Sequence, residues 1–354
     1  MTDTLTGWAA TTKDAPLVQM QLPLPQWNEH SVDMDISHCG MCGSDIHTLD
    51  EDWGPTAFPC VVGHEIVGIV TRVGDKVANI KVGDRGGVGP LAYSCQECDT
   101  CLEGHQNCCE RVFVGTYNGN YPNGDKSFGG YADKWRGDGR WVFKVPDNMS
   151  SADASSFFCA GVTSYAPLKK FNVNEKSVVG VLGLGKLLFA CHRGLGHFGV
   201  LFAKAMGATV IGLSHNDNKK ETAKELGCDD YINTHNEFDL ARYRKKFTHI
   251  LCTGTGSDFQ WSTYYNLLHI NGHFMNVAAP EWKFPEIIPI QFITQQISIS
   301  GSAAGSPATM QEMINFAAEK EIKPWITTYK MSDVNTAISD LRAGKPRFRF
   351  VLEN

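Results

Sequence analysis

Hydrophobic and polar positions follow two different patterns along the chain. In residues 1–150, short β-branched runs such as HEIVGIVTRVGDKV (64–77) lie between Gly, Pro and Cys, which indicates strands joined by tight turns. From Lys176 onward, a Val-rich strand (SVVGVLGLG), a helix (GHFGVLFAKAMGA), a second strand (TVIGLS) and a second helix (DNKKETAKELG) follow one another. Alternating strands and helices are typical of a parallel sheet. The pattern therefore predicts a mostly-β part followed by an α/β part.

Later segments complete the predicted parallel sheet. Strand-like runs at 249–253, 273–278 and 297–301 each follow a loop or a helical stretch, so we expect a doubly wound sheet of about six strands. The helix-like SPATMQEMINFAAEK and the strand-like RFRFVLEN return to the mostly-β part. We therefore expect one domain made of residues 1–159 and 303–354, and a second made of residues 160–302.

Composition narrows the classes of function. With 354 residues, 42% of them hydrophobic and 20% charged, the chain can bury a large core. A formal net charge of -6 provides no basic surface for a phosphate backbone, so we expect no nucleic acid partner. Neither a leader-like N-terminus nor a run of about 18 apolar residues is present, which predicts no membrane partner and a cytoplasmic location.

The cysteines are spaced for metal binding. Twelve of them in such a chain favour metal ligation or free thiols over a disulfide framework. The spacing C-x2-C-x2-C-x7-C lets one loop surround a tetrahedral ion, and we expect a structural zinc held by Cys95, Cys98, Cys101 and Cys109. The alternative, unliganded surface thiols, would expose the loop to oxidation. Cys108 is the spare thiol, although its position lets it trade places with its neighbour.

Several motifs occur together in a defined order. CGMCGSDIHTLDEDWG, GHEIVGIV, the four-cysteine segment, FFCAGVTSYAPLKKF and a glycine-rich turn follow one another. In this order they resemble the zinc-containing medium-chain alcohol dehydrogenases, particularly the NADP-dependent, cinnamyl-alcohol-dehydrogenase-like branch, over nearly the whole chain. The resemblance implies an α/β protein with a mostly-β GroES-like catalytic domain and a doubly wound Rossmann cofactor domain. It also implies two zinc ions per chain, NADP(H), and hydride transfer to or from aromatic or medium-chain aldehydes and alcohols.

The resemblance implies a catalytic zinc. Its ligands would be Cys42, His64 and Cys159, which leaves a fourth position for water or a substrate oxygen. Asp45 and Glu65 match positions that orient the ligands, with a plain buried salt bridge as the alternative for each. A zinc-free quinone reductase of the same superfamily conflicts with these ligands.

The same resemblance implies a proton route and a substrate pocket. Ser44 matches the hydroxyl that takes the alcohol proton, and His47 matches the imidazole that passes it to solvent through the cofactor ribose. Gly115 stands where plant cinnamyl enzymes usually carry Trp, so we expect a roomier apolar pocket. Core packing is the alternative for Phe58. The implied pocket residues are Trp53, Phe58, Gly115 and Phe292.

The glycine-rich turn of the cofactor domain is interrupted. Gly183, Leu184 and Gly185 end the first strand, KLLFACHR (186–193) follows, and only then does the motif restart with Gly194, Leu195, Gly196 and His197. Glycines at this turn let a pyrophosphate approach a helix N-terminus, so we expect the inserted segment to disturb cofactor binding. A tolerated loop, a disabling variant and a gene-model error remain open as its origin. A folded non-enzyme that binds zinc is the alternative function.

The end of the second strand predicts the cofactor. Ser214, His215 and Lys219 stand where an acidic residue would grip the ribose of NAD, and they suit the 2'-phosphate of NADP. Asp217 leaves NAD as the alternative. The strand-like QISISGS resembles the edge through which family members pair their sheets, so we expect a homodimer. The other cofactor contacts implied are Thr163, Gly183, Gly185, Gly194, Leu195, Gly196, Val277, Ser302 and Arg349.

Overall fold

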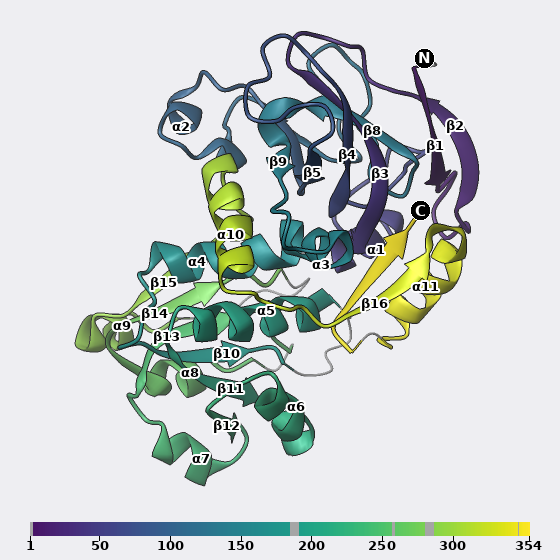
Figure 1. Cartoon of the computed structure of the whole chain (residues 1–354). Coiled ribbons are helices and arrows are strands. Elements are labelled where there is room, and N and C mark those ends of the chain that lie inside the picture. Colours follow the sequence, from purple (N-terminus) through teal and green to yellow (C-terminus); the bar gives the residue numbers. More distant parts are fainter. Residues whose placement is uncertain (1–2, 185–190, 257–258, 280–286, 346) are drawn as a thin grey trace. The chain divides into compact units, whose positions relative to one another are not determined.

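A computed structural model describes residues 3–184, 191–256, 259–279, 287–345 and 347–354. The chain divides into two compact units, one made of Met1–Val162 and Ala304–Asn354 and the other of Thr163–Ala303 (Figure 1). The division expected from the sequence was residues 1–159 with 303–354 against residues 160–302. None of the helices in the described ranges is long and apolar enough to cross a bilayer.

The first unit is built mainly from strands. Its seven-stranded sheet contains β3 (Ser31–Met41), β4 (Ile66–Val73), β5 (Arg85–Val88), β8 (Lys134–Asp138), β9 (Phe143–Lys144), β16 (Ile326–Lys330) and β17 (Arg349–Glu353). The order is β16-β17-β3-β4-β5-β9, and β8 also pairs with β3. Two-stranded sheets join β1 (Thr4–Ala9) to β2 (Val18–Pro23), and β6 (Leu91–Ser94) to β7 (Phe113–Gly115). The predicted mostly-β part is confirmed.

The long strand β3 organises this unit. Val32, Met34 and Ile36 are buried while Asp33 and Asp35 between them are more exposed, the alternation that a half-buried strand requires. The antiparallel pairing of β17 with β3 explains why the last segment returns to the first unit. The helices of the unit are α1 (Gly43–Leu49), α2 (Asp99–Leu102), α3 (Ser151–Ser156), α10 (Pro307–Glu319) and α11 (Val334–Arg342).

The second unit contains a parallel six-stranded sheet. Its strands are β10 (Val178–Leu182), β11 (Thr209–Ser214), β12 (Asp230–Asn233), β13 (Phe247–Cys252), β14 (Leu268–Asn276) and β15 (Ser298–Gly301). The order β12-β11-β10-β13-β14-β15 confirms the predicted doubly wound sheet. The order reverses beside β10, where the connections leave a crevice at the carboxyl ends of the strands. The helices are α4 (Val162–Lys170), α5 (Cys191–Ala205), α6 (Lys220–Glu225), α7 (Glu237–Arg242), α8 (Trp261–Leu267) and α9 (Pro289–Gln295).

The turn after β10 differs in part from the prediction. Gly183 has a φ of +111°, and a Cβ there would lie 2.3 Å from Thr253 Oγ1, so only glycine fits. α5, however, begins at Cys191 inside the inserted segment, so Gly194, Leu195 and Gly196 belong to a helix rather than to a turn. Gly185 lies outside the described residues, as does most of the inserted segment.

Candidate functional site

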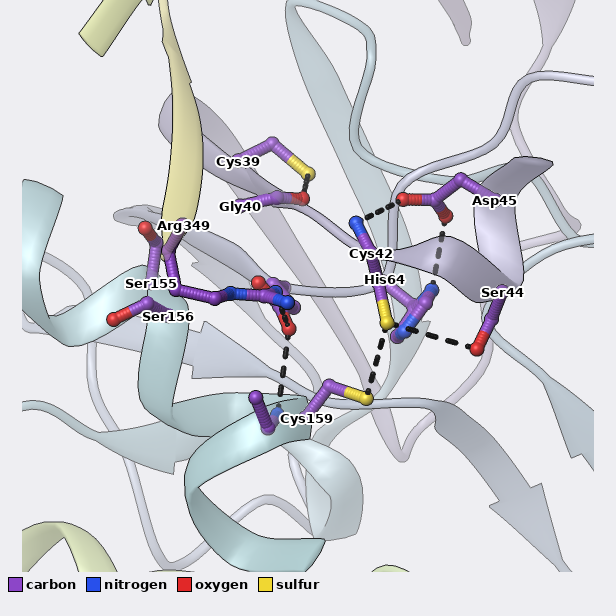
Figure 2. Close-up of polar contacts among 12 residues, drawn as sticks. Cys39, Gly40, Cys42, Ser44, Asp45, His64, Ser155, Ser156, Cys159 and Arg349 are labelled. Carbon is purple, nitrogen blue, oxygen red and sulfur yellow. Dashed lines mark hydrogen bonds and ion pairs between the residues drawn. The ribbon is translucent and has the colours of Figure 1, made fainter. Parts of the chain in front are cut away.

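Four potential metal ligands meet in the first unit. One donor atom from each of Cys42, His64, Glu65 and Cys159 lies within 4.8 Å of the other three. Cys42 caps the N-terminus of α1, and Cys159 lies in a π-helical turn, Phe157–Gly161, between α3 and α4. π-helical turns widen a helix and are frequent at functional sites. Segments far apart in the sequence thus bring the predicted ligands together (Figure 2).

The geometry of this cluster fits zinc. The sulfur atoms of Cys42 and Cys159 are 3.9 Å apart. Two thiolates on one tetrahedral zinc lie about 3.8 Å apart, because each Zn–S bond is about 2.3 Å. A hydrogen bond from Cys159 lowers the pKa of Cys42, which favours the thiolate that a metal needs. Two thiolates and a neutral imidazole would hold the ion without net charge.

Asp45 is the hydrogen-bonding hub behind the ligands. Its Oδ1 accepts hydrogen bonds from His64 Nδ1 at 3.0 Å and from Gly63 N at 3.1 Å. Its Oδ2 accepts from Cys42 N at 2.8 Å and from the hydroxyl of Tyr131 at 3.0 Å. The side chain thereby fixes the backbone of one metal ligand and the ring of another, as a carboxylate behind a metal site does. A plain salt bridge would not engage both ligands.

Sequence analysis missed two tyrosines beside Asp45. The hydroxyl of Tyr117 lies 3.1 Å from His64 Nδ1, and its ring centroid lies 5.5 Å from that of the imidazole. Burial and the charge of Asp45 raise the pKa of both Tyr117 and Tyr131. Both are therefore protonated phenols, and Tyr131 donates its hydrogen to Asp45. Because both lie far from Asp45 in sequence and in no ligand motif, no spacing pattern pointed to them.

Glu65 is fully buried next to the metal ligands. Its Oε1 accepts from Ala160 N at 3.4 Å and forms an ion pair with Arg349. Its Oε2 has no hydrogen-bond partner among the described residues, and burial raises the pKa of the carboxyl to about 8. Such a carboxylate is available to a metal. Arg349, predicted as a cofactor contact, instead supports Glu65 within the first unit, and its contact with a cofactor stays a prediction.

The predicted proton-route residues lie on and after α1. Ser44 Oγ is 3.6 Å from Cys42 Sγ, so its hydroxyl lies beside the metal ligands (Figure 2). His47 Nδ1 hydrogen-bonds Asp52 Oδ2 at 2.8 Å, a partner that the sequence analysis did not single out. Trp53, predicted to wall the substrate pocket, stacks on His47 with ring centroids 4.5 Å apart and remains 56% exposed. Trp53 thus shields the imidazole.

The other predicted pocket residues fall in different places. Gly115 ends β7 close to Tyr117, whose carbonyl oxygen would lie 3.0 Å from a Cβ at 115. Phe58 is partly exposed, and its carbonyl oxygen accepts a hydrogen bond from Lys126. Phe292 lies on α9 of the second unit and packs against that unit's own core cluster. The roles of all three in a pocket stay predictions.

The four-cysteine loop forms a second metal cluster in the first unit. Sulfur distances of 3.9 Å (Cys95 to Cys101), 3.8 Å (Cys98 to Cys109) and 3.4 Å (Cys95 to Cys109) fit a tetrahedral zinc and exceed a disulfide bond. Cys108 is exposed and lies outside the cluster, so Cys109 is its fourth member and fits the predicted ligand set. The hydrophobic cluster of this loop consists of the cysteines themselves, so zinc replaces a core.

A pocket opens in the second unit at the carboxyl ends of its strands. Its lining residues are Leu182, Gly183, Leu213, Ser214, His215, Thr234, His235, Gly254, Thr255, Gly256, Phe259, Gln260, Thr263 and Tyr264. None of these described lining residues is acidic. Ser214 and His215 lie at the tip of β11, as predicted for a ribose site, and this is the edge where a doubly wound sheet binds nucleotides.

The remaining predicted cofactor residues surround this edge or lie in helices. Val277 and Ser302 follow β14 and β15, where their backbone N–H groups donate to Cys252 O and Asn276 O. Lys219 ends the short helical turn after β11, in which Asp217 accepts a hydrogen bond from Asn233 at 3.3 Å. Thr163 lies on α4. Leu195 O, within α5, accepts a hydrogen bond from the hydroxyl of Ser164.

Known proteins share both units of this chain. Residues 28–147 match the model described as alcohol dehydrogenase GroES-like domain, and residues 194–319 match that described as zinc-binding dehydrogenase. The probable formaldehyde dehydrogenase AdhA of Bacillus subtilis is 39% identical over 92% of this chain and 90% of its own. The NADP-dependent alcohol dehydrogenase C 1 of Mycolicibacterium smegmatis is 36% identical over 99% of this chain and 98% of its own.

Solved structures are similar over the full length. A cinnamyl alcohol dehydrogenase of Sorghum bicolor, SbCAD4, aligns with a TM-score of 0.90 and 32% identity, covering 99% of this chain and 97% of that one. A CAD of Helicobacter pylori, complexed with NADP(H), aligns with a TM-score of 0.87 and 30% identity, covering 100% of this chain and 99% of that one. These similarities extend over both units, and so over the two cysteine-containing clusters and the nucleotide-type pocket.

Proposed function

Because this chain belongs to the zinc-containing alcohol dehydrogenases of the medium-chain family, we propose that it interconverts aromatic or medium-chain aldehydes and alcohols with NADP(H). The observation that carries the proposal is the buried cluster of Cys42, His64 and Cys159 with the hydroxyl of Ser44 beside it. The folded non-enzyme has no support among the named relatives, which are dehydrogenases.

Two groups of side chains would serve the reaction. One group would hold the zinc, and the other would move the proton of the alcohol. Cys42, His64 and Cys159 would hold zinc, which supplies Lewis-acid polarisation of the substrate oxygen when bound. Ser44 accepts the alcohol proton in oxidation and returns it in reduction. His47 continues the route. Its Nδ1 is hydrogen-bonded to Asp52 Oδ2 at 2.8 Å, which leaves Nε2 as the nitrogen that exchanges protons. The side chain of Asp52 is 28% exposed, so this hydrogen bond lies close to solvent.

The nucleotide pocket favours NADP(H). A carboxylate at the end of the second strand would bind the ribose hydroxyls of NAD and repel a 2'-phosphate. This pocket instead has Ser214, His215 and His235 in its lining, and Asp217, which follows the second strand, is hydrogen-bonded to Asn233. A hydroxyl and two imidazoles suit a phosphate ester. NADP-dependent relatives of this family are consistent with that preference.

We infer the substrate class from the residues that are predicted to line the substrate pocket. Gly115 places no side chain beside Tyr117, and Trp53 offers an aromatic, half-exposed wall. We therefore expect aromatic or medium-chain aldehydes to react better than ethanal.

Assembly and location complete the proposal. β15 is the edge strand of its sheet, and Ile287, Ile288, Ile290 and Ile293 on or before α9 are 43–69% exposed. An open strand edge beside apolar side chains suits pairing with a second copy, so we infer a homodimer.

A cytoplasmic location is supported by the described cysteines, all of which are free thiols or zinc-type ligands.

An aldehyde panel with zinc-replete protein tests the activity. We expect NADPH-dependent reduction of cinnamaldehyde-type and medium-chain aldehydes with a higher kcat/KM than for ethanal, and a lower kcat/KM with NADH. Zinc analysis should give two ions per chain. No NADPH-dependent turnover at full zinc occupancy would support the non-enzyme, and equal efficiency with both cofactors would refute the NADP preference.

A further inference from the structure

His64 Nδ1 faces two oxygen atoms rather than one. Asp45 Oδ1 lies 3.0 Å away, and the hydroxyl of Tyr117 lies 3.1 Å away. When a neutral imidazole binds a metal through Nε2, its single N–H is on Nδ1. Both oxygens lie within hydrogen-bond distance of that nitrogen, so the phenol oxygen of Tyr117 is a second acceptor for the N–H beside the carboxylate.

Asp45 accepts hydrogen bonds from four groups around the metal ligands. They are the backbone N–H groups of Cys42 and Gly63, the imidazole of His64 and the phenol of Tyr131, and the carboxylate itself is 1% exposed. A carboxylate has about four lone-pair positions, so these donors determine its orientation. The hydroxyl of Tyr117 therefore acts on the imidazole directly.

The two phenols are not equivalent. Tyr131 is completely buried and contacts Asp45 Oδ2, away from the imidazole nitrogen. Tyr117 is partly exposed, and its ring lies against the ring of His64 at an angle of 55°. Tyr117 thus contacts the imidazole twice, through its hydroxyl at Nδ1 and through its ring.

The backbone on each side of Tyr117 is anchored. Thr116 N donates to Pro90 O at 3.0 Å, and the Thr116 hydroxyl donates to Gly89 O at 2.5 Å. On the other side, Asn118 Oδ1 accepts from Ala57 N at 2.8 Å. These hydrogen bonds fix the position of the phenol, as is required of a group that orients a metal ligand.

We propose that Tyr117 is a positioning residue of the catalytic centre, whose hydroxyl, together with Asp45 Oδ1, fixes the orientation of His64 at its Nδ1. The proposal rests on the proposed zinc ligation by His64. Its consequence is that Tyr117 sets how tightly the catalytic metal is held and how the imidazole is presented to it. The structural zinc, held by four thiolates in a separate loop, is independent of it.

Tyr117→Phe tests this role, with Tyr131→Phe as the matched control. Each variant removes one phenol hydroxyl beside the metal ligands: Tyr117→Phe removes a contact with His64, whereas Tyr131→Phe removes a contact with Asp45. We expect Tyr117→Phe to weaken catalytic-site metal binding about 10-fold or more in chelator competition, the usual range for groups behind metal ligands. In protein with cobalt at the catalytic site and zinc at the structural site, the cobalt absorption bands should shift. Tyr131→Phe should cause a smaller loss and unshifted bands.

The structural zinc serves as the folding control within each variant. Its retention, with an unchanged circular dichroism spectrum, shows that the phenylalanine variant is folded. Parental metal affinity and parental cobalt bands in folded Tyr117→Phe would overturn the positioning role while leaving the metal centre intact. A parent protein that binds zinc only at the four cysteines would instead overturn the proposed catalytic metal centre.

Discussion

Gly40 leaves room for the buried carboxylate beside the metal ligands. A Cβ at this position would lie 2.0 Å from Glu65 Oε2. Glu65 is fully buried and Arg349 is 3% exposed, so the ion pair between them has no water to replace a lost partner. Displacing one member of such a pair leaves an uncompensated charge in the interior. The absence of a side chain at residue 40 is therefore a condition for the pair.

Gly40→Ala should destabilise the first unit by about 3 kcal/mol or more, the usual cost of breaking a buried ion pair. The midpoint of urea unfolding measures the effect. Gly83→Ala is the control, because Gly83 has a φ of +88° and nothing within 4 Å of a Cβ, so only backbone strain of about 1–2 kcal/mol is added. A Gly40→Ala midpoint no lower than that of Gly83→Ala would contradict the prediction.

Some residues of the candidate site could be predicted from the sequence, and others could not. The zinc ligands could be predicted because cysteine and histidine carry their chemistry in the side chain, and the resemblance supplied their order. Tyr117, Tyr131 and Asp52 could not, because a hydrogen-bonding role depends on where the fold places a common polar group. The ion pair of Arg349 with Glu65 was likewise not foreseen, and the expected contact of Arg349 with the cofactor stays a prediction.

At the level of elements, the four-cysteine loop depends on its metal. The segment from β6 through α2 to β7 has a hydrophobic cluster made only of its cysteines. Without zinc, nothing else in that cluster would hold α2 in place. The loop therefore behaves as a separate cooperative segment whose order follows the ion.

Cys98→Ser should reduce bound zinc from two ions per chain to one and accelerate hydrogen exchange in the segment from β6 to β7. The reason is that a hydroxyl does not replace a thiolate in a four-sulfur site. Metal analysis and hydrogen-exchange mass spectrometry give the readout. Cys108→Ser is the control, since Cys108 is exposed and outside the cluster. Loss of zinc in Cys108→Ser would reverse the ligand assignment.

The N-terminus of α5 affects the expected phosphate-binding glycines. The helix begins at Cys191, and Gly194 to Gly196 lie within it, so their N–H groups are drawn into the helical hydrogen-bond ladder. The glycines therefore cannot all offer free N–H groups to a pyrophosphate. The element order of the sheet was predictable because buried strands are local and Val-rich, but the helix start was not, because the inserted segment has no matching pattern.

Deletion of Lys186–Arg193 should tighten NADPH binding and raise kcat/KM, because it restores a glycine turn directly before the helix. Fluorescence titration of NADPH with the parent and the deletion variant measures the change. Zinc content should remain at two ions per chain in both, since the ligands lie in the other unit. Equal dissociation constants for the two forms would refute the prediction.

At the level of the whole molecule, the proposed dimer gives the last prediction. Ile290 and Ile293 are 58% and 69% exposed on α9, next to the edge of the sheet that ends in β15. Ile290→Lys combined with Ile293→Lys should convert the dimer to monomer in sedimentation velocity, because two desolvated charges oppose pairing. Phe238→Lys is the control: Phe238 is 88% exposed on α7, beside β12 at the opposite edge. A parent that sediments as a monomer would contradict the dimer.

The pairing of β17 with β3 imposes an order on synthesis. β17 carries Arg349, the partner of Glu65, and it leaves the ribosome after all of Thr163–Ala303 has been made. Domains made earlier fold while translation continues. The nucleotide-type unit is contiguous and can close on itself first, whereas the unit with the catalytic ligands must wait with an unpaired β3 edge. Loading of the catalytic zinc should therefore be a late, post-translational event, and a stalled nascent chain would carry the ligands without a finished site.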